Sequence, residues 1–294
     1  MPNTLKIAVL LTCYNRKANT IACLERLLRN TLPENYTLAV FLVDDGSTDG
    51  TTQAVNQHYP QVTVIKGSGH LYWNGGMQLA WENALQHNAD FFLWLNDDVE
   101  LKENSLETLL FTYQSVRTDS SNPVIIGNLC DEKTGELTYG GCVVDKGLFH
   151  FRSRKLPVSD TVTACDTING NVVLIPKSTV DRIGTLNKNF THAMGDFDYG
   201  LRCTAVGIPI FSTAGFIGTC SNNPISNTWT DPTIPLKNRL AKLKLPTGLP
   251  PYEYFLYNKA HTNIFTATFL LLTLYLKVVF PAAWVNLSNL LKGS

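Results

Sequence analysis

The chain has 294 residues, 44% of them hydrophobic and 16% charged, so it has enough apolar material for the core of a globular protein. Its formal net charge is zero, which gives no support for a nucleic-acid partner. The charge is unevenly placed: residues 233–294 carry seven Lys or Arg against one acid, and residues 1–232 carry 17 against 23. A basic tail of this kind favours contact with a polyanion or a membrane surface.

The first half of the chain alternates predicted strands with predicted helices. "KIAVLLTCYNR" indicates a buried strand followed by a loop, and residues 17–29 have helical periodicity. A second strand ends at Val43 and a helix is expected near 50–58; "VTVIKG" and "DFFLWLNDD" are further strands, with the helix-like "MQLAWENALQH" between them. This alternation predicts a doubly wound, mostly parallel sheet with helices on both faces.

Beyond residue 120 the pattern loosens. "PVIIGNLC" and "LTYGGCVV" are expected to be strands joined by the turn "DEKTGE", and "INGNVVLIP" to be a single strand stopped by Pro176. "GDFDYGLRCTAVG" predicts a helix with acids at its start and Gly207 as its stop. Residues 221–252 are rich in Asn, Thr and Pro, so we expect mostly loop there.

Residues 264–276 contain no charge, and Lys277 ends the run. A spanning helix needs about 20 apolar residues, so an interfacial helix or a helix packed on the body or on another subunit is expected instead. Seven cysteines without a C-x-x-C pair argue against a disulfide framework or a zinc site and favour a reducing cytosol. The N-terminal apolar run is too short for a signal peptide, so we expect a cytoplasmic protein.

Three polar loops follow predicted strands: "TCYNR", "DDGSTDG" and "NDDVE". In open α/β sheets the ligand lies outside the carboxyl ends of the strands, so these loops are expected to meet in one crevice. Asp97 and Asp98 fit a divalent metal site that faces a phosphorylated ligand, although alone they fit a solvated turn or a helix cap. Asp45 fits an acceptor for a nucleobase or ribose, or an acidic turn that caps a helix.

Two more segments carry candidate site residues. In "GSGHLYWNGGM", Gly75 and Gly76 before a helix would let the backbone approach a diphosphate; the alternative is an ordinary loop with a packed tryptophan. In "HAMGDFDYGLR", Asp196 is either a helix cap or a general base aimed into the crevice. Asp198 is expected to pair with Arg202 at i+4 in a structural role.

In this order and spacing, "LLTCYNR", "FLVDDGSTDGT", "WLNDDVEL" and "GDFDYGLR" resemble the family 2 glycosyltransferases of the GT-A fold, over roughly residues 5–220. The segments "YWNGGM" and "NDDVEL" look most like those of bacterial enzymes that build surface polysaccharides, including rhamnosyltransferase-like members. The resemblance implies a GT-A domain over 1–225, with a nucleotide-binding half (1–120) and an acceptor half (121–225). A basic, apolar helical extension follows over 226–294.

The resemblance also implies roles for individual residues. It places Thr12, Tyr14 and Asn15 at the donor nucleotide, with Tyr14 against the base, and Asp45 at the base edge. Asn74, Gly75 and Gly76 would help position the donor, Asp97 would face the ribose, and Asp98 would hold Mg²⁺ or Mn²⁺. Asp196 matches the catalytic base of inverting members. Many relatives have a metal-binding His near 217–222, where this chain has Cys220, a poor ligand for Mg²⁺.

The function expected from this resemblance is inverting transfer of a sugar from a nucleoside diphosphate sugar, such as dTDP-rhamnose or a UDP-sugar, to an acceptor hydroxyl of a glycan or lipid-linked acceptor. The alternatives are a non-catalytic partner in a polysaccharide assembly complex and a sugar-nucleotidyltransferase, although the loop "TCYNR" lacks the glycines of the latter. The extension is expected to meet the inner face of the cell membrane or a second subunit.

Overall fold

The structure is a computed structural model that describes residues 4–221 and 227–281. Contacts divide the chain into two compact units, each of which is built from several segments. The first unit comprises Met1–Val144, Ser153–Thr191 and Gly195–Asn222, and the second comprises Asp145–Arg152, His192–Met194 and Asn223–Ser294. The boundary predicted after residue 225 stays a prediction, and the second unit takes in two short segments that the sequence did not mark.

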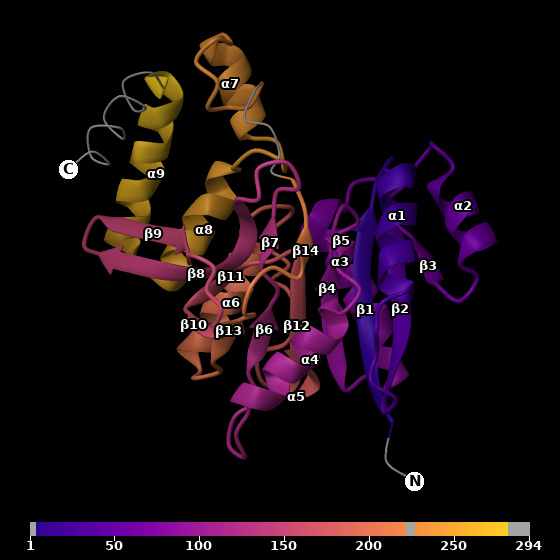
Figure 1. Ribbon diagram of the computed structural model, residues 1–294. Coiled ribbons are helices and arrows are strands. Elements are labelled where there is room, and N and C mark those ends of the chain that lie inside the picture. The colour runs from indigo at the N-terminus through magenta and orange to yellow at the C-terminus, as the bar shows by residue number, and fades with distance from the viewer. Residues whose placement is uncertain (1–3, 222–226, 282–294) are drawn as a thin grey trace. The chain divides into compact units, whose positions relative to one another are not determined.

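The strands and helices of the first half alternate, as predicted (Figure 1). They are β1 (Leu5–Cys13), α1 (Lys17–Leu28), β2 (Tyr36–Asp44), α2 (Thr51–His58), β3 (Thr63–Lys66), α3 (Tyr72–Ala84), the 3-10 turn η1 (Leu85–His87), β4 (Phe91–Leu95), β5 (Glu100–Leu101) and α4 (Ser105–Val116).

The second half begins with short strands. They are β6 (Val124–Ile126), β7 (Leu129–Cys130), β8 (Leu137–Gly147), β9 (His150–Lys155), β10 (Thr163–Cys165), β11 (Thr167–Asn169) and β12 (Val172–Pro176). Then come α5 (Lys177–Ile183), α6 (Gly195–Ala205), β13 (Ile210–Ser212), β14 (Gly218–Thr219), α7 (Leu236–Leu243), α8 (Pro251–His261) and α9 (Ile264–Val279).

An eight-stranded sheet forms the centre of the first unit, in the order β10-β13-β6-β12-β4-β1-β2-β3. β1 pairs in parallel with both β2 and β4, and β2 pairs in parallel with β3. β12 is antiparallel to its neighbours β4 and β6. The predicted doubly wound, mostly parallel sheet is therefore confirmed, and the carboxyl ends of β1, β2 and β4 lie at the same edge.

Alternate residues of β1 enter two cores, one on each face of this sheet. Ile7, Val9 and Leu11 pack with α1 and α4, while Ala8 and Leu10 pack with α3. Strands that are covered on both faces read as continuous apolar runs, which is why β1 and β4 lack the alternation of a half-exposed strand. Fully buried Trp81 of α3 and Trp94 of β4 lie against each other, with ring centroids 5.6 Å apart.

Two expectations about local structure were wrong. "INGNVVLIP" is two strands rather than one, because the chain turns at Gly170–Asn171 and passes from one sheet to the other. The helix expected from residue 77 begins earlier, at Tyr72, and it packs on β1 and β2. The described part of the segment expected to be mostly loop, residues 221 and 227–252, is mostly loop, apart from α7 and the start of α8; Leu243 of α7 is buried against α9.

A smaller sheet pairs β11-β8-β7-β14-β5, with β9 on β8. In the second unit, the end of the β8–β9 hairpin packs with α8 and α9: Phe151 lies 5.7 Å from the ring of Tyr257. Asn263 caps α9 by accepting a hydrogen bond from the backbone N–H of Thr266. Across residues 4–221 and 227–281, no helix has the length and apolar character needed to cross a bilayer.

Candidate functional site

The polar loops that follow β1, β2 and β4 lie together at the carboxyl edge of the large sheet, as predicted. Backbone contacts join the first two, because the Asp45 N–H donates to the carbonyl of Cys13 at 2.9 Å. β12 runs in the opposite direction, so the residue before it, Asn171, also lies at this edge, where its carbonyl accepts the Asn96 N–H at 3.0 Å. Segments around residues 13, 45, 96 and 171 therefore build one site.

Asn15 joins the first two loops. Its N–H donates to the Ser47 hydroxyl at 2.9 Å, and its side-chain oxygen accepts the Thr48 N–H at 2.7 Å. The backbone of Asn15 is left-handed, with φ at 51°, a conformation that asparagine tolerates better than most residues. Asn15 thus organises the loops, while Tyr14 beside it is 55% exposed and open to a ligand. Their predicted contacts with a nucleotide stay predictions.

Asp45 is buried, and its carboxylate holds the segment that leads into α3. It accepts hydrogen bonds from the N–H groups of Gly69, Leu71 and Tyr72, at 2.7, 2.8 and 3.1 Å. Gly67 allows this approach, because a Cβ there would lie 2.6 Å from the carboxylate. The sequence suggested a base contact or a helix cap for Asp45; the structure shows a carboxylate that orders the next loop, and the base contact stays a prediction.

The expectation that Gly75 and Gly76 precede a helix was wrong, because both lie inside α3. The Gly75 N–H already donates to the Leu71 carbonyl, so these glycines do not present a free helix start to a diphosphate. Gly76 has a packing role instead: a Cβ there would lie 2.1 Å from the Thr12 hydroxyl oxygen. Thr12 is therefore held directly beneath α3, at the end of β1.

Asn74 is completely buried in α3, where its side-chain amide donates to the carbonyls of Asn187 and Phe190, at 3.0 and 2.7 Å. These contacts join the helix to the loop that precedes α6. A Cβ at Gly195 would lie 1.9 Å from the Asn74 side-chain oxygen, so the first residue of α6 must be this small. The structure gives the Asn74 side chain a role in positioning α6, and its predicted donor contact stays a prediction.

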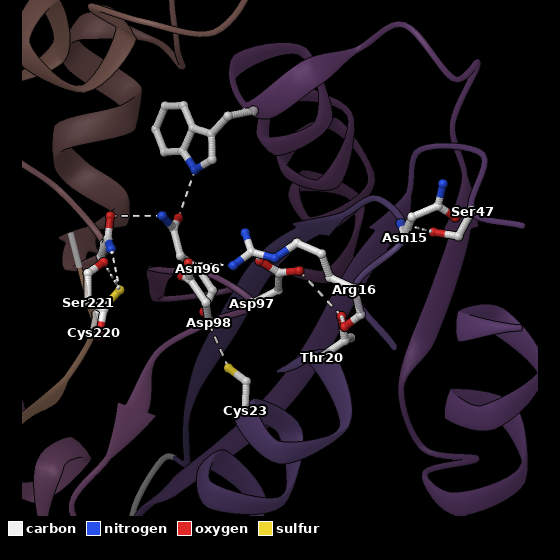
Figure 2. A network of polar contacts seen from close by, with 12 residues as sticks. Asn15, Arg16, Thr20, Cys23, Ser47, Asn96, Asp97, Asp98, Cys220 and Ser221 are labelled. Carbon is white, nitrogen blue, oxygen red and sulfur yellow. Dashed lines mark hydrogen bonds and ion pairs between the residues drawn. The ribbon is translucent and has the colours of Figure 1, made fainter. Parts of the chain in front are cut away.

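Arg16 forms ion pairs with both neighbouring carboxylates (Figure 2). Its Nη1 lies 3.2 Å from Asp97 Oδ1 and its Nη2 2.6 Å from Asp98 Oδ2. Thr20 of α1 donates to Asp97 at 3.3 Å. Burial raises the pKa of Asp97 to about 7, against the opposing effect of Arg16. Asp97 therefore points to α1 and Arg16, and its predicted contact with a ribose stays a prediction.

A chain of side-chain hydrogen bonds crosses the site from α3 to Cys220, the residue after β14. The indole N–H of Trp73 donates to Asn96 Oδ1 at 2.7 Å, and Asn96 Nδ2 donates to Asn171 Oδ1 at 2.7 Å. Asn171 Nδ2 in turn lies 3.2 Å from the Cys220 sulfur. Asn96, which had no role in the sequence analysis, is thus the centre of the network that sets the position of the Asp97–Asp98 turn.

Asp196 lies in the first turn of α6, half-buried, as expected for a residue at a helix start. Its two oxygens accept the N–H groups of Gly170 and Phe197, at 3.0 and 2.9 Å. Burial raises its pKa to about 6 despite these two hydrogen bonds, which act to lower it. The predicted structural pair is confirmed: Arg202 Nε lies 2.8 Å from Asp198 Oδ2.

The Gly170–Asn171 turn connects the two groups of carboxylates. Gly170 donates to Asp196, and the next residue, Asn171, bonds to Asn96 beside Asp97. One turn therefore links a half-buried carboxylate with a raised pKa to the segment that carries the Asp-Asp pair.

Comparison with known protein families shows which family the chain belongs to. The sequence profile described as "Glycosyl transferase family 2" matches residues 8–173, more than half of the chain. The chain belongs to glycosyl transferase family 2. This assignment favours glycosyl transfer over the sugar-nucleotidyltransferase alternative, and the matched range contains the strands and loops that carry Asp45, Asp97 and Asp98.

Two curated relatives of this chain are described as glycosyltransferases. The galactofuranosyltransferase GlfT2 of Mycobacterium tuberculosis is 22% identical over 245 residues, which cover 73% of this chain and 37% of the relative. An uncharacterized glycosyltransferase, the MG060 homolog of Mycoplasma pneumoniae, is 32% identical over 110 residues, which cover 36% of each protein. The chain thus spans little more than a third of the length of either relative.

Solved structures support the GT-A fold. A mannosyltransferase from Pyrobaculum calidifontis, solved with GDP-Man and Mn²⁺, has a TM-score of 0.54 at 13% identity; the match covers 95% of this chain and 83% of that one. GalNAc-T7, solved with UDP, GalNAc and Mn²⁺, has a TM-score of 0.58 at 13% identity, with 88% of this chain and 51% of that one covered. At this identity the likeness concerns the fold alone.

The side chains of this site are only partly suited to binding a hard cation such as Mg²⁺. Asp98 Oδ1 is buried and makes no hydrogen bond in the described structure, whereas Oδ2 is paired with Arg16. Cys220 has a pKa of about 12, raised by burial and by Asp98, so it stays a thiol and a poor ligand. No group of three His, Cys, Asp or Glu side chains within the described ranges could hold a metal by itself.

Sequence reasoning missed Arg16, Asn96, Gly170 and Asn171 as parts of the site. A signal existed for Arg16, since it is the basic residue of "TCYNR", a loop already expected at the crevice. No local signal existed for Gly170–Asn171, because its segment read as the middle of one strand.

Proposed function

We propose that this chain transfers a sugar from a nucleoside diphosphate sugar to an acceptor hydroxyl, with inversion at the anomeric carbon. The observation that carries the proposal is the placement of Asp196: the Gly170–Asn171 turn holds this carboxylate beside the Asp97–Asp98 turn, at the edge of the sheet where α/β proteins bind ligands. Membership of glycosyl transferase family 2 supports the same reaction class.

Asp196 is the general base of this proposal. A pKa of about 6 leaves the carboxylate ionised at neutral pH but still basic enough to accept a proton from an attacking hydroxyl. Each oxygen uses one lone pair on a backbone N–H, from Gly170 and Phe197, which fixes its direction and leaves acceptor capacity for the substrate. An acceptor that attacks opposite the leaving diphosphate gives the inverted product.

The donor nucleoside is assigned to the loops after β1 and β2. Tyr14 is exposed enough to stack on a base, and Asn15 holds its loop against Ser47 and Thr48. Thr12 and Asp45 complete this end of the site. The donors that we propose are dTDP-rhamnose or a UDP-sugar, and the acceptor is a glycan or a lipid-linked glycan in polysaccharide synthesis at the inner face of the cell membrane.

A divalent cation, Mg²⁺ or Mn²⁺, fits Asp98, whose Oδ1 is buried without a hydrogen bond. Such ions accept one or two carboxylates and complete their coordination with substrate phosphates and water, so the lack of a three-residue protein site in the described part of the chain is compatible with this assignment. When bound, the ion would offset negative charge on the departing diphosphate. Mn²⁺ in two solved structures of the same fold supports the proposal.

A panel of nucleoside diphosphate sugars, each with and without Mn²⁺, identifies the donor by the rise in melting temperature that binding causes. Transfer is then compared between the wild type and Asp196→Asn, which should lose about 10²- to 10⁴-fold in turnover and keep its nucleotide affinity. Asp181→Asn, on the exposed face of α5, is the control and should behave like the wild type. Wild-type turnover in Asp196→Asn would refute the assignment of the base, and no nucleotide binding at all would favour the non-catalytic partner.

A further inference from the structure

Helix α9 is apolar on its exposed side as well as on its buried side. Ala267, Leu270, Leu274 and Val278 face the interior of the second unit. The opposite side exposes large apolar side chains on successive turns: Phe265 is 77% exposed, Leu272 60% and Leu276 55%. Soluble proteins rarely expose a contiguous apolar stripe unless it meets a partner.

The end of the β8–β9 hairpin extends this stripe. Leu148 and Phe149 at the turn are 68% and 56% exposed. The Thr266 hydroxyl donates to the Leu148 carbonyl at 2.8 Å, and the rings of Phe149 and Phe269 lie 5.2 Å apart. Helix and hairpin end therefore form one surface, here called the apolar patch: Leu148, Phe149, Phe265, Phe269, Leu272 and Leu276.

The charge of the same unit indicates what covers this patch. Its described residues, 145–152, 192–194 and 227–281, include eight Lys or Arg and three Asp or Glu, a net charge of +5. Exposed Lys146 and Arg152 lie on either side of the hairpin turn. Pairing with a second copy would bring two such basic units together, whereas an anionic bilayer attracts them.

We propose that the apolar patch docks on an anionic lipid bilayer, with α9 lying in the interface and the side chains of Phe265, Leu272 and Phe149 inserted at the boundary of headgroups and acyl chains. Interfacial helices combine such an apolar face with basic residues that meet lipid phosphates. Binding here is separate from sugar transfer, so it stands or fails independently of the proposed reaction.

Flotation with vesicles tests this docking on the full chain. Binding should be strong on equal mixtures of phosphatidylcholine and phosphatidylglycerol, weak on phosphatidylcholine alone, and weaker at high salt. The double variants Phe265→Ser with Leu272→Ser, and Leu148→Ser with Phe149→Ser, should each lose about tenfold or more in partitioning, because each removes two large side chains of the apolar patch.

Phe111→Ser is the matched control, since Phe111 is 71% exposed on α4 of the other unit and should not affect vesicle binding. Circular dichroism and melting temperature verify that each variant folds. Equal binding to neutral and anionic vesicles, no binding to either, or wild-type partitioning of both double variants would overturn the proposal. So would a lipid-free dimer, seen by light scattering, that the same variants dissociate.

Discussion

Arg16 occupies the position next to both carboxylates that a metal-bound donor would approach, and replacing it tests the electrostatics of the site. Its guanidinium lies 3.2 Å from an oxygen of Asp97 and 2.6 Å from one of Asp98, with side-chain exposures of 42%, 5% and 21%. Arg16→Gln keeps a polar side chain but removes the charge, leaving two adjacent carboxylates without a cation.

Arg16→Gln is expected to lower the free energy of unfolding and to raise the affinity for Mn²⁺. Breaking a fully buried ion pair costs about 3–5 kcal/mol, and the exposure of Arg16 reduces this to about 1–2 kcal/mol of unfolding free energy. For a chain of this size that corresponds to a melting temperature about 2–3 °C lower. Loss of a unit charge near the proposed cation site should favour a divalent ion by a similar amount, about 1–2 kcal/mol after screening, or about five- to thirtyfold tighter Mn²⁺ binding.

Differential scanning fluorimetry with and without MnCl₂ measures the first effect, and titration of free Mn²⁺ by electron paramagnetic resonance, with and without UDP, measures the second. Mn²⁺ should restore most of the lost stability in Arg16→Gln. The control is Arg26→Gln in α1, whose exposed partner Glu100 lies 3.8 Å away. An Arg16→Gln variant with wild-type melting temperature, or with weaker Mn²⁺ binding, would refute the reasoning.

Three further predictions concern single groups. Because the proposed base, Asp196, must be ionised and its pKa is raised to about 6, transfer should rise with pH to a plateau above about pH 7 and fall to about a tenth of it at pH 5; a flat profile of initial rates between pH 5 and 8 contradicts this. Gly76→Ala should lower stability by about 1–3 kcal/mol in urea unfolding, because its Cβ would meet the Thr12 hydroxyl at 2.1 Å, whereas Gly75→Ala, with its nearest neighbour at 3.3 Å, should change stability little. Tyr199→Phe should leave stability equal or raise it by about 1 kcal/mol, because the Tyr199 hydroxyl is buried without a hydrogen bond in the described structure; a loss of more than about 1 kcal/mol would reveal a partner.

Local patterns in the sequence were enough to predict the sheet and the edge at which its polar loops meet. The apolar runs of β1, β2 and β4, each followed by polar residues, predict parallel strands whose carboxyl ends meet, and the structure confirms that arrangement. The pair of Asp198 with Arg202 could also be predicted, because residues four apart on a helix are neighbours whatever the rest of the fold does.

Local patterns failed where a residue's role depends on distant parts of the chain. Gly75 and Gly76 looked like a free helix start, but α3 begins earlier because its first turn is held by Asp45, in the loop after β2. "INGNVVLIP" looked like one strand, since nothing within it shows that its two ends pair in different sheets.

The sequence by itself determined the alternating strands and helices of the first half and which loops carry carboxylates, because these follow from the spacing of apolar and polar residues over a few positions. Only the tertiary structure decided that Arg16 neutralises Asp97 and Asp98, and that Gly170 directs Asp196. Those contacts join residues that lie 26 to 82 positions apart, so they depend on strand order and register, which no local periodicity encodes.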